Sequence, residues 1–556
     1  MSSIQSHARA PFGALPALSA TAIAVATLLT ACGGGDADMS VPDVGSVSID
    51  LTDGPASHLD KVWVTIKEVW FHRSDSATTG EGKWEKFPLA APVTVDMNTL
   101  SNGTLAKAFS GIQLPVGTYK QIRLFLAGSE DPLTASAKAA GLAYNDQINY
   151  TDAKGAKQVA ALEIASAANG IGLNGVFEIA KGKTLRLAVE FNVGDDVVRF
   201  SHNSADAFKL QPNLRYFDLD SAAAISGKID MSACGSLATP CREIAVKLEE
   251  PAADGAYNRI ARWTAVKPDG TFMLYPVPAS KGKTYDLVIT GRNTQPMLVR
   301  GVPATAGSTP AKGAVSVAAT ALQIKPANDF PVNIKPGVTP TGSRVGFYAT
   351  PTAADKPYEF GFSHLNGFTG TMTRDYRMAN GPLLVGAYLA GGSPNFSAVA
   401  PAEGSGAYSA VFSANNFKRA AAAAAVAASG TSTSFVTPPT MLPLATVAQL
   451  GTITGNLIQS KAGAWDRGLL VVSHRGAIVN AITLDTVLSA NGGSGGAYAI
   501  TSLPSGSKAN PLAGGAYDVY LRIWNSKTPD KVKTIQLKDL ADLRSASAAT
   551  MNVTLP

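Results

Sequence analysis

The sequence predicts a mainly β protein made of tandem antiparallel β-sandwich domains. Its 556 residues include 53 Gly and 33 Pro, and only 16% of them are charged, a composition typical of turn-rich β modules. Short runs in which apolar and polar residues alternate have the period of half-buried strands. At about 150 residues per domain, the length allows three or four domains.

The first 31 residues are typical of a secretory signal peptide. Arg9 is their only fixed cation, an Ala/Leu-rich apolar stretch follows from Ala14 to Leu29, and small residues end it. Leu29-Thr30-Ala31-Cys32 resembles the lipobox of bacterial lipoproteins. Cys32 would then carry a diacylglyceryl group and an acyl chain such as palmitate, and at least two chains are needed for stable anchoring. An ordinary signal peptide with a chance cysteine is the alternative.

Residues 32–42 are predicted to be a lipidated tether. Gly33-Gly34-Gly35-Asp36 is flexible and would connect a folded body to a membrane. In Gram-negative sorting, Asp directly after the lipidated cysteine favours retention at the inner membrane. Gly33 occupies that position, so we expect the outer membrane, with the periplasmic or the exposed face left open.

The charge pattern excludes one class of partner. The net charge is +6, but the Lys and Arg residues form no dense block, so nucleic-acid binding receives no support. A mildly basic body could lie close to an anionic envelope surface, and ordinary solvated charges are the alternative. Neither a cofactor nor a metal site is expected, and the oligomeric state is left open.

Two further cysteines are predicted to pair. Cys234 and Cys241 lie close together in a chain directed to an oxidising compartment. They lack the neighbouring His or second Cys pair of a zinc site, and they do not form a Cys-x-x-Cys motif. A local disulfide would contribute about 2 to 3 kcal/mol by restricting the unfolded chain.

Residues 43–220 are predicted to form the first folded unit. Its strands are expected at 47–51, 62–69, 121–126, 185–191 and 208–212. In the second of these, Val62, Val64 and Ile66 alternate, but Val69 is one position out of phase. A β-bulge near Lys67-Glu68 would reconcile the two phases.

The order of motifs in this unit resembles domain-of-unknown-function family 4382. The motifs are Leu51-Thr52-Asp53-Gly54-Pro55, Val64-Thr65-Ile66 with Val69, Leu114-Pro115-x-Gly117-x-Tyr119 with Ile122-Arg123-Leu124, and Leu210-x-Pro212. Gly54 stands where the family usually has Ala, and Glu190-Phe191-Asn192 where it tends to have Asp-Phe-Asp. The resemblance implies an envelope lipoprotein with a β-rich module, and it implies no reaction.

Two later regions, 221–334 and 449–556, share one plan. The first has Ile225-Ser226-Gly227, Val277-Pro278 and Tyr285-Asp286-Leu287, and the second has Ile453-Thr454-Gly455, Leu503-Pro504 and Tyr517-Asp518-Val519. The succession resembles the carboxypeptidase regulatory-like, or transthyretin-like, β-sandwich. This name belongs to an accessory domain, so no peptidase activity is implied.

A third sandwich is predicted between these repeats, over residues 343–428 with an Ala-rich end. Lys335-Pro336-Gly337 reads as the linker before it. Residues 420–428 are mostly alanine and predict a short helix. Residues 429–448 contain Pro438-Pro439 and predict a linker to the last module.

Two glycine-rich motifs have the wrong context for catalysis or nucleotide binding. Gly492-Gly493-Ser494-Gly495-Gly496 has the spacing of a nucleophile elbow, but no histidine follows it, so we predict a hairpin loop. Residues 170–175 match the dinucleotide fingerprint but run into an alternating, strand-like segment. The histidines have no metal-binding spacing.

Two pairs of residues near the first turn are candidates for binding. Asp50 and Asp53 could give two oxygens to calcium, which is too few, and backbone N–H bonds to Asp53 are the favoured alternative. Trp63 and Trp70 fall outside the core-facing set and could stack on sugars. Cross-strand packing uses the same residues and is the commoner case.

The sequence therefore predicts a noncatalytic cell-envelope lipoprotein, anchored through Cys32, that binds, adheres or acts as a scaffold. An envelope glycan or protein would be its partner. The alternative is an envelope glycan hydrolase with paired carboxylates in the first unit, which would need two acids about 5 to 9.5 Å apart in one cleft.

Overall fold

The residues that the computed structural model describes all lie within 43–556. Cys32 and the predicted signal peptide therefore lie outside the described residues. The described ranges are 43–54, 59–128, 131–152, 154–164, 167, 169–202, 205–210, 214–234, 241–252, 255–334, 344–364, 374–413, 418–427, 434–436, 450–474, 477–505, 516–537 and 540–556.

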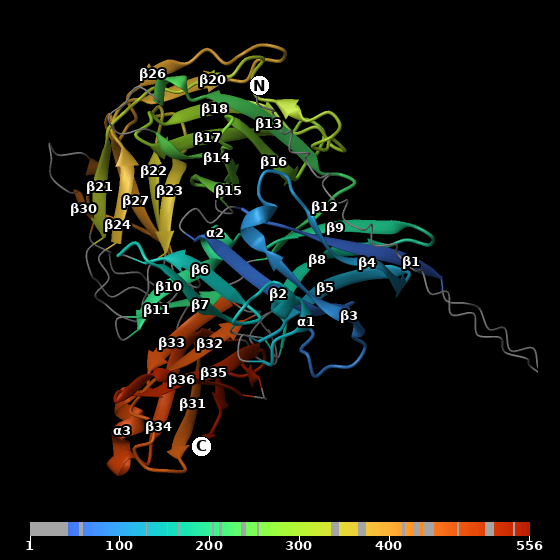
Figure 1. The fold of residues 1–556 in the computed structure, drawn as a ribbon, viewed down its shortest axis with the longest axis vertical. Helices are drawn as coiled ribbons and strands as arrows, with labels where there is room; N and C mark the ends of the chain where they lie inside the picture. Colours follow the sequence, from blue (N-terminus) through green and yellow to red (C-terminus); the bar gives the residue numbers. More distant parts are fainter. Residues whose placement is uncertain are drawn as a thin grey trace, which may run out of the picture. The chain divides into compact units, whose positions relative to one another are not determined.

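The first domain, strands β1–β12, packs a four-stranded sheet against an eight-stranded sheet (Figure 1). The smaller sheet has the order β12-β9-β1-β4, and the larger has β10-β11-β7-β6-β2-β5-β8 with β3 paired to β2. The elements are β1 Val44–Thr52, β2 Lys61–His72, β3 Glu85–Asp96, η1 Met97–Leu100, β4 Ala106–Pro115, β5 Gly117–Leu126, α1 Ala135–Ala139, β6 Gln147–Thr151, β7 Lys157–Ile164, β8 Ile171–Ile179, β9 Thr184–Glu190, α2 Val193–Asp196, β10 Val197–His202, β11 Ala205–Leu210 and β12 Arg215–Asp218.

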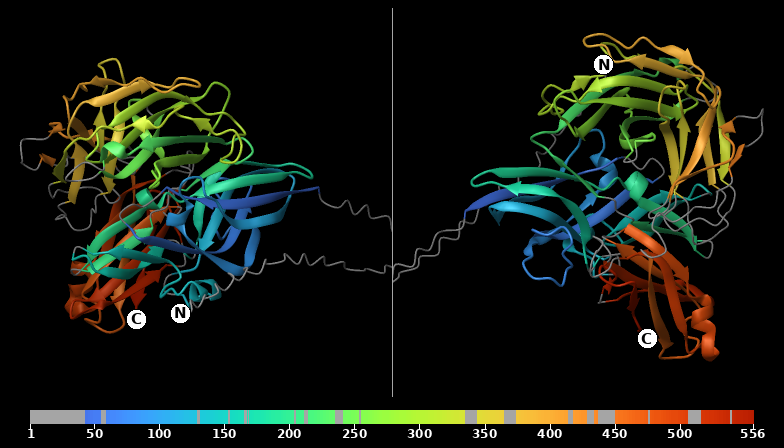
Figure 2. Two further views of the ribbon diagram at one scale, coloured as in Figure 1. Left: turned by 45° about the horizontal axis from the view of Figure 1, so that its top comes forward. Right: turned by 180° about the vertical axis from the view of Figure 1, so that it is seen from behind.

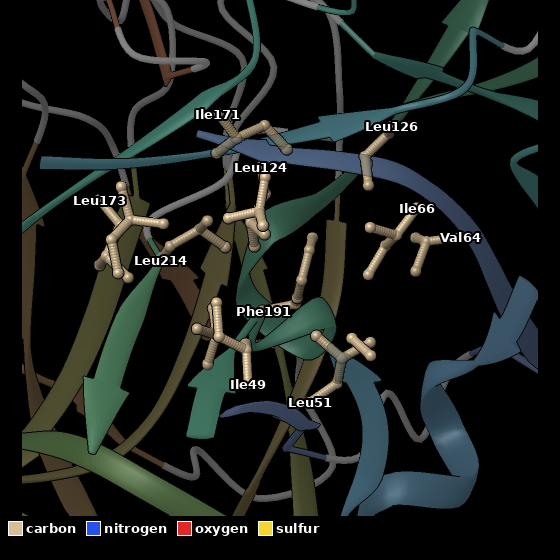
Figure 3. Close-up of a cluster of buried hydrophobic side chains, with 14 of the residues drawn as sticks. Ile49, Leu51, Val64, Ile66, Leu124, Leu126, Ile171, Leu173, Phe191 and Leu214 are labelled. Carbon is tan, nitrogen blue, oxygen red and sulfur yellow. The ribbon is translucent and has the colours of Figure 1, made fainter. Parts of the chain in front are cut away.

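The core of this domain lies where the alternating apolar positions of both sheets meet. Figure 3 shows Ile49 and Leu51 of β1 facing Leu124 of β5 and Leu173 of β8. The predicted bulge is confirmed, because the register of β2 against β3 and against β5 shifts between Ile66 and Glu68.

The second and fourth domains have the same topology. In each, one strand (β13 or β31) pairs antiparallel with a later strand and parallel with two short ones, and a second sheet has the order β15-β14-β17-β18 or β33-β32-β35-β36. The predicted repeat thus has a structural counterpart, and the fourth domain is the orange-to-red part of Figure 2.

The bounds of the second domain are β13 Ala223–Asp230, η2 Ser232–Cys234, β14 Arg242–Pro251, β15 Asn258–Ala265, β16 Thr271–Val277, β17 Thr284–Arg292, β18 Met297–Pro303, β19 Val315–Ser316 and β20 Leu322–Gln323. Those of the fourth are β31 Leu450–Gln459, β32 Arg467–His474, β33 Ala477–Thr483, α3 Asp485–Gly493, β34 Ala497–Pro504, β35 Ala516–Asn525, β36 Thr528–Gln536, β37 Ala541–Asp542, β38 Ala548–Thr550 and β39 Val553–Leu555.

The third domain shares a sheet with the second. Strands β25 and β26 extend the second domain's sheet beyond β18, so Leu287 of β17 faces one core and Val288 faces the other. Strand β21 pairs with β24 and β30, and it therefore packs with the third domain although the sequence places it in the second. The elements are β21 Asp329–Ile334, β22 Arg344–Ala349, β23 Tyr358–His364, β24 Arg374–Ala379, β25 Leu383–Ala387, β26 Ser397–Val399, β27 Ala407–Ser413, β28 Ala420–Ala421, β29 Val426–Ala427 and β30 Ser434–Val436.

Two local predictions are wrong. The Ala-rich segment forms the short strands β28 and β29 rather than a helix, because both pair with β27 and tertiary pairing overrides the weak preference of alanine. The glycine-rich motif around Ser494 connects α3 to β34 rather than two strands of a hairpin, and its backbone is no longer helical at Gly492. A helix followed by a strand is the reverse of the order in a nucleophile elbow.

A tyrosine fixes the start of one strand in three domains. Tyr119 of β5, Tyr285 of β17 and Tyr517 of β35 each donate a hydroxyl hydrogen bond to the carbonyl of an upstream proline, at 3.2, 2.7 and 2.5 Å. The acceptors are Pro115, Pro278 and Pro504. The proline and the tyrosine that recur in the sequence are thus joined by a hydrogen bond that connects two neighbouring segments.

Replacing Tyr517 with phenylalanine is expected to remove this hydrogen bond from the fourth domain. The ring stays buried, but the carbonyl of Pro504 loses its donor, which costs about 1 kcal/mol. The midpoint of urea unfolding of the full chain, with hydrogen exchange at β35 as the local measure, checks this. An unchanged midpoint and unchanged exchange would show that water replaces the hydrogen bond at no cost.

Candidate functional site

A concentration of buried charge lies where β1 and β9 end. These strands are parallel, with Thr52 opposite Glu190, so their carboxyl ends meet at the same edge of the sheet. The turn residue Asp53 follows β1, and Val193 begins α2 shortly after β9. Two motifs far apart in the sequence thus form one polar site.

Glu190 is the centre of this site, and we call Thr52, Asp53, Glu190, Arg215 and Arg262 the Glu190 cluster. One carboxylate oxygen accepts a hydrogen bond from Arg262 and the other accepts one from Arg215, each at 2.7 Å. The side chain of Glu190 is 1% exposed and that of Arg262 is 5% exposed. Both oxygens are therefore engaged and closed off from solvent.

Arg262 reaches the site from β15 of the second domain. It also donates to Thr52 Oγ1 and to the carbonyl of Tyr275, each at 2.8 Å, and its guanidinium lies 5.1 Å from the ring centre of Phe217. One side chain thus joins β1 and β9 of the first domain to β15 and β16 of the second. A planar guanidinium suits this role because it donates in several fixed directions.

Asp53 is buried beside these charges. Its Oδ1 accepts the backbone N–H of Val193 at 2.8 Å, and its Oδ2 has no hydrogen-bond partner. Burial, reinforced by the charge of Glu190, raises the pKa of Asp53 well above its ordinary value. The predicted backbone bonds to Asp53 are therefore present, one of them from a residue far along the chain.

The packing around Gly54 explains the glycine at that position. A Cβ there would lie 3.1 Å from Asn192 Oδ1 and 3.3 Å from Nε1 of Trp263 in the second domain. Both contacts are closer than usual, so alanine, which the resembled family usually has, would push these two neighbours apart. The departure from the family pattern coincides with the contact between the domains.

The sequence did not reveal Arg262 as a member of this site. It lies 72 residues from Glu190 on a strand where Arg would ordinarily face solvent. Asp50, the second candidate for calcium, is on β1, and burial raises its pKa. Among the described residues, no group of three or more His, Cys, Asp or Glu is arranged to hold a metal.

Trp70 and Trp63 are placed differently from an open platform. Trp70 packs against Phe125 and Trp84, with ring centres 4.4 and 5.7 Å away, and Lys86 Nζ lies 3.7 Å from its ring centre. Trp63 is half-buried on the same strand, and its ring centre lies 5.1 Å from Lys61 Nζ. Cross-strand packing therefore occupies Trp70, and its role in ligand contact stays a prediction.

Cys241 is disulfide-bonded, and its sulfur lies 3.6 Å from the carbonyl of Asn293. Cys234 ends η2, and its side chain lies outside the described residues. The pairing of these two cysteines stays a prediction.

Comparisons with solved structures find tandem β repeats with very low similarity. Two B repeat units of the collagen binding protein of Staphylococcus aureus have 10% identity over 92% of this chain and 98% of that chain, with a TM-score of 0.11. The pilus adhesin SpaC of Lactobacillus rhamnosus GG has 9% identity over 89% of this chain and 56% of that chain, with a TM-score of 0.14. Neither is close enough to assign a ligand here.

A search of curated proteins gave no match. A family model does match the part of the chain that contains β1, β9 and the acidic half of the Glu190 cluster. Residues 44–212 match the family described as Domain of unknown function (DUF4382).

Proposed function

We propose that the protein is a noncatalytic cell-envelope lipoprotein that is anchored in the outer membrane through Cys32. Its β-sandwich body acts as a binding or scaffolding module on the membrane surface. The lipobox-like segment and the glycine tether support the anchor, and the second and fourth domains are proposed to be carboxypeptidase regulatory-like modules. No helix among the described residues is long and apolar enough to cross a membrane.

One observation carries the noncatalytic part of the proposal. Glu190 and Asp53 are neighbouring acids in the first domain, but each is 1% exposed and both oxygens of Glu190 accept hydrogen bonds from arginines. A glycosidase needs its two carboxyl groups in a cleft that admits substrate and water. The cluster instead holds two domains in contact, which suits a scaffold.

The anchor is tested by comparing the wild-type chain with the Cys32→Ala variant in cells fed a labelled fatty acid. We expect the wild type in the outer-membrane fraction with label, and the variant unlabelled and released from that fraction. A Ser2→Ala variant is the control, because it changes the signal peptide away from the processed site. A variant that still acquires label and sediments with the membrane would overturn the anchor.

The noncatalytic part is tested on the purified body lacking residues 1–32. We expect no release of soluble sugar from peptidoglycan or envelope polysaccharide. Release that disappears in the Glu190→Gln variant would establish the hydrolase in its place, provided that the variant keeps the wild-type circular dichroism spectrum.

A further inference from the structure

The outer face of the first domain's large sheet is polar and aromatic, yet it is buried. Trp70 and His72 of β2 lie beside Arg123 and Gln121 of β5, and Asn174 of β8 is the next neighbour. Their alternation partners, such as Ile122, face the core. We call these five residues and Phe125 the floor. His72, Gln121 and Arg123 are 8%, 1% and 7% exposed.

The cover is the connection between β2 and β3, residues 73–84, which we call the strap. Four floor or strap side chains hold it by its backbone carbonyls: His72 to Gly82 at 3.0 Å, Arg123 to Ala77 at 3.0 Å, Asn174 to Asp75 at 3.0 Å and Trp84 to Thr78 at 2.8 Å. Apart from the ring of Trp84, which packs against Trp70 and His72, the strap therefore lies on the floor through hydrogen bonds.

The strap itself buries little. Of residues 73–83 only Ala77 is buried, and Trp84 closes the far end at 9% exposure. Segments with few buried apolar contacts and many solvent-facing hydrogen bonds are those that open locally at low free energy. Opening the strap would expose the floor without disturbing the core beneath it.

Three floor groups are left unpaired while the strap is closed. Trp70 Nε1 is a donor, Gln121 Oε1 and Asn174 Oδ1 are acceptors, and all three atoms are buried without a hydrogen-bond partner. A buried polar atom without a partner costs about 1 to 3 kcal/mol. In the closed state the strap carbonyls have hydrogen-bond donors, whereas these three floor atoms have no hydrogen-bond partner.

A saccharide has the chemistry that these groups lack. Each of its hydroxyls both donates and accepts, so it can serve the indole N–H of Trp70 and the amide oxygen of Gln121 together. Lys86 and Phe125 stay against the ring of Trp70 when the strap opens, so its indole N–H rather than its face is the group available to a ligand. Once Nη2 of Arg123 leaves the carbonyl of Ala77, it can donate to a carboxylate, while Nη1 keeps its 2.7 Å bond to the carbonyl of Asn169.

We propose that the strap is a lid and that the floor beneath it binds an acidic oligosaccharide, such as a uronic acid polymer. This inference rests on the proposed function as a binding module and names its ligand class. Trp70 and Arg123 would then contact the ligand, whereas Trp63 lies outside the site.

The fourth domain latches the lid. Arg544 donates to the carbonyl of Ser76 at 3.1 Å and lies 3.3 Å from Glu81 Oε1, both on the strap. Asp542 holds the same guanidinium at 2.8 Å. Removing Arg544 takes away the hold of the fourth domain on the strap and leaves the floor unaltered.

The test measures tetragalacturonate binding by calorimetry and strap opening by hydrogen exchange, with maltotetraose as the neutral probe. In the Arg544→Ala variant we expect faster exchange of strap amides and at least 5-fold tighter binding of tetragalacturonate, because less free energy is spent on opening. Arg467→Ala is the matched control, since that arginine is exposed on the same domain and pairs with Asp485. It should change neither measurement.

The floor is tested by Gln121→Met, which keeps the size of the side chain and removes the amide. We expect tetragalacturonate affinity to fall at least 10-fold in the Arg544→Ala background while strap exchange stays fast. Fast strap exchange without tetragalacturonate binding would overturn the site, and equal affinity for maltotetraose would overturn its acidic ligand. Slow exchange in Arg544→Ala would overturn the latch. The membrane-fractionation test does not depend on ligand binding or on strap exchange, so it tests the proposed anchor independently.

Discussion

Replacing Arg262 with alanine is expected to destabilise the contact between the first and second domains by about 3 to 5 kcal/mol, because it leaves a buried carboxylate without one of its partners. Glu190 would keep Arg215 but lose the 2.7 Å bond from Arg262, and Thr52 would lose its donor. Hydrogen exchange of peptides from β9 and β15 measures the loss locally. We expect both to lose protection while β35 of the fourth domain keeps it.

Arg259 provides the control on the same strand. It pairs with Glu250 at 3.1 Å, but its side chain is 48% exposed, and exposed ion pairs contribute about 0 to 1 kcal/mol. Arg259→Ala should therefore leave exchange at β9 unchanged. If the two alanine variants behaved alike, burial of the Glu190 cluster would not be what holds the domains together.

A double-mutant cycle separates the pair from its surroundings. Glu190→Gln and Arg262→Met should each be costly alone, and the double variant should cost less than their sum, because the fully buried pair is removed together and only the half-buried Arg215 is left without its carboxylate. A purely additive result would show that Arg262 acts through Thr52 and Tyr275 rather than through Glu190.

The strands could be predicted from the sequence because each one carries its own alternation. Even the bulge in β2 could be predicted, because the phase change between Ile66 and Val69 is local. The two repeats could also be predicted, since a proline and a tyrosine mark the same position in both. What these patterns lack is the partner of each strand, which is why the sequence places β21 in the second domain although it packs with the third.

The candidate site could be predicted only in part, for the same reason. The turn at Asp53 is visible in the sequence, but nothing in it indicates that Val193 or Arg262 would lie beside that carboxylate. Gln121 and Arg123 alternate with apolar residues and therefore read as solvent-facing. The strap buries them, and a pattern with period two cannot show which loop will fold back over a face.

The C-terminal domains are thus held to the first domain by buried charges as well as by apolar contacts, such as the cluster in which Ala188 and Phe217 meet Tyr275 of the second domain. Arg262 connects the second domain to the first, and Arg544 connects the fourth domain to the first. Ionic contacts of this kind set a fixed geometry, but their strength depends on protonation. A third contact, between β11 and β35, shows this dependence most clearly.

Lys209 of β11 is expected to weaken that contact at neutral pH. It is 2% exposed, its Nζ lies 4.0 Å from Glu163 Oε2, and Arg522 of β35 already binds the same carboxylate at 2.9 Å. Burial lowers the pKa of Lys209 to about 8, Glu163 opposes this, and the positive charge of Arg522 adds to it. The folded chain therefore holds this proton less tightly than the unfolded chain does.

Lys209→Met is accordingly expected to raise the free energy of unfolding at pH 7, by up to about 3 kcal/mol for a pKa lowered from 10.5 to about 8. In the wild type, stability should rise between about pH 8 and 10.5, where the unfolded chain still holds the proton and the folded chain has released it. The variant should lack this rise. Lys157→Met, at an exposed lysine of the same sheet, should retain it. A less stable Lys209→Met variant at pH 7 would mean that the ammonium's attraction to Glu163 exceeds the cost of burying it.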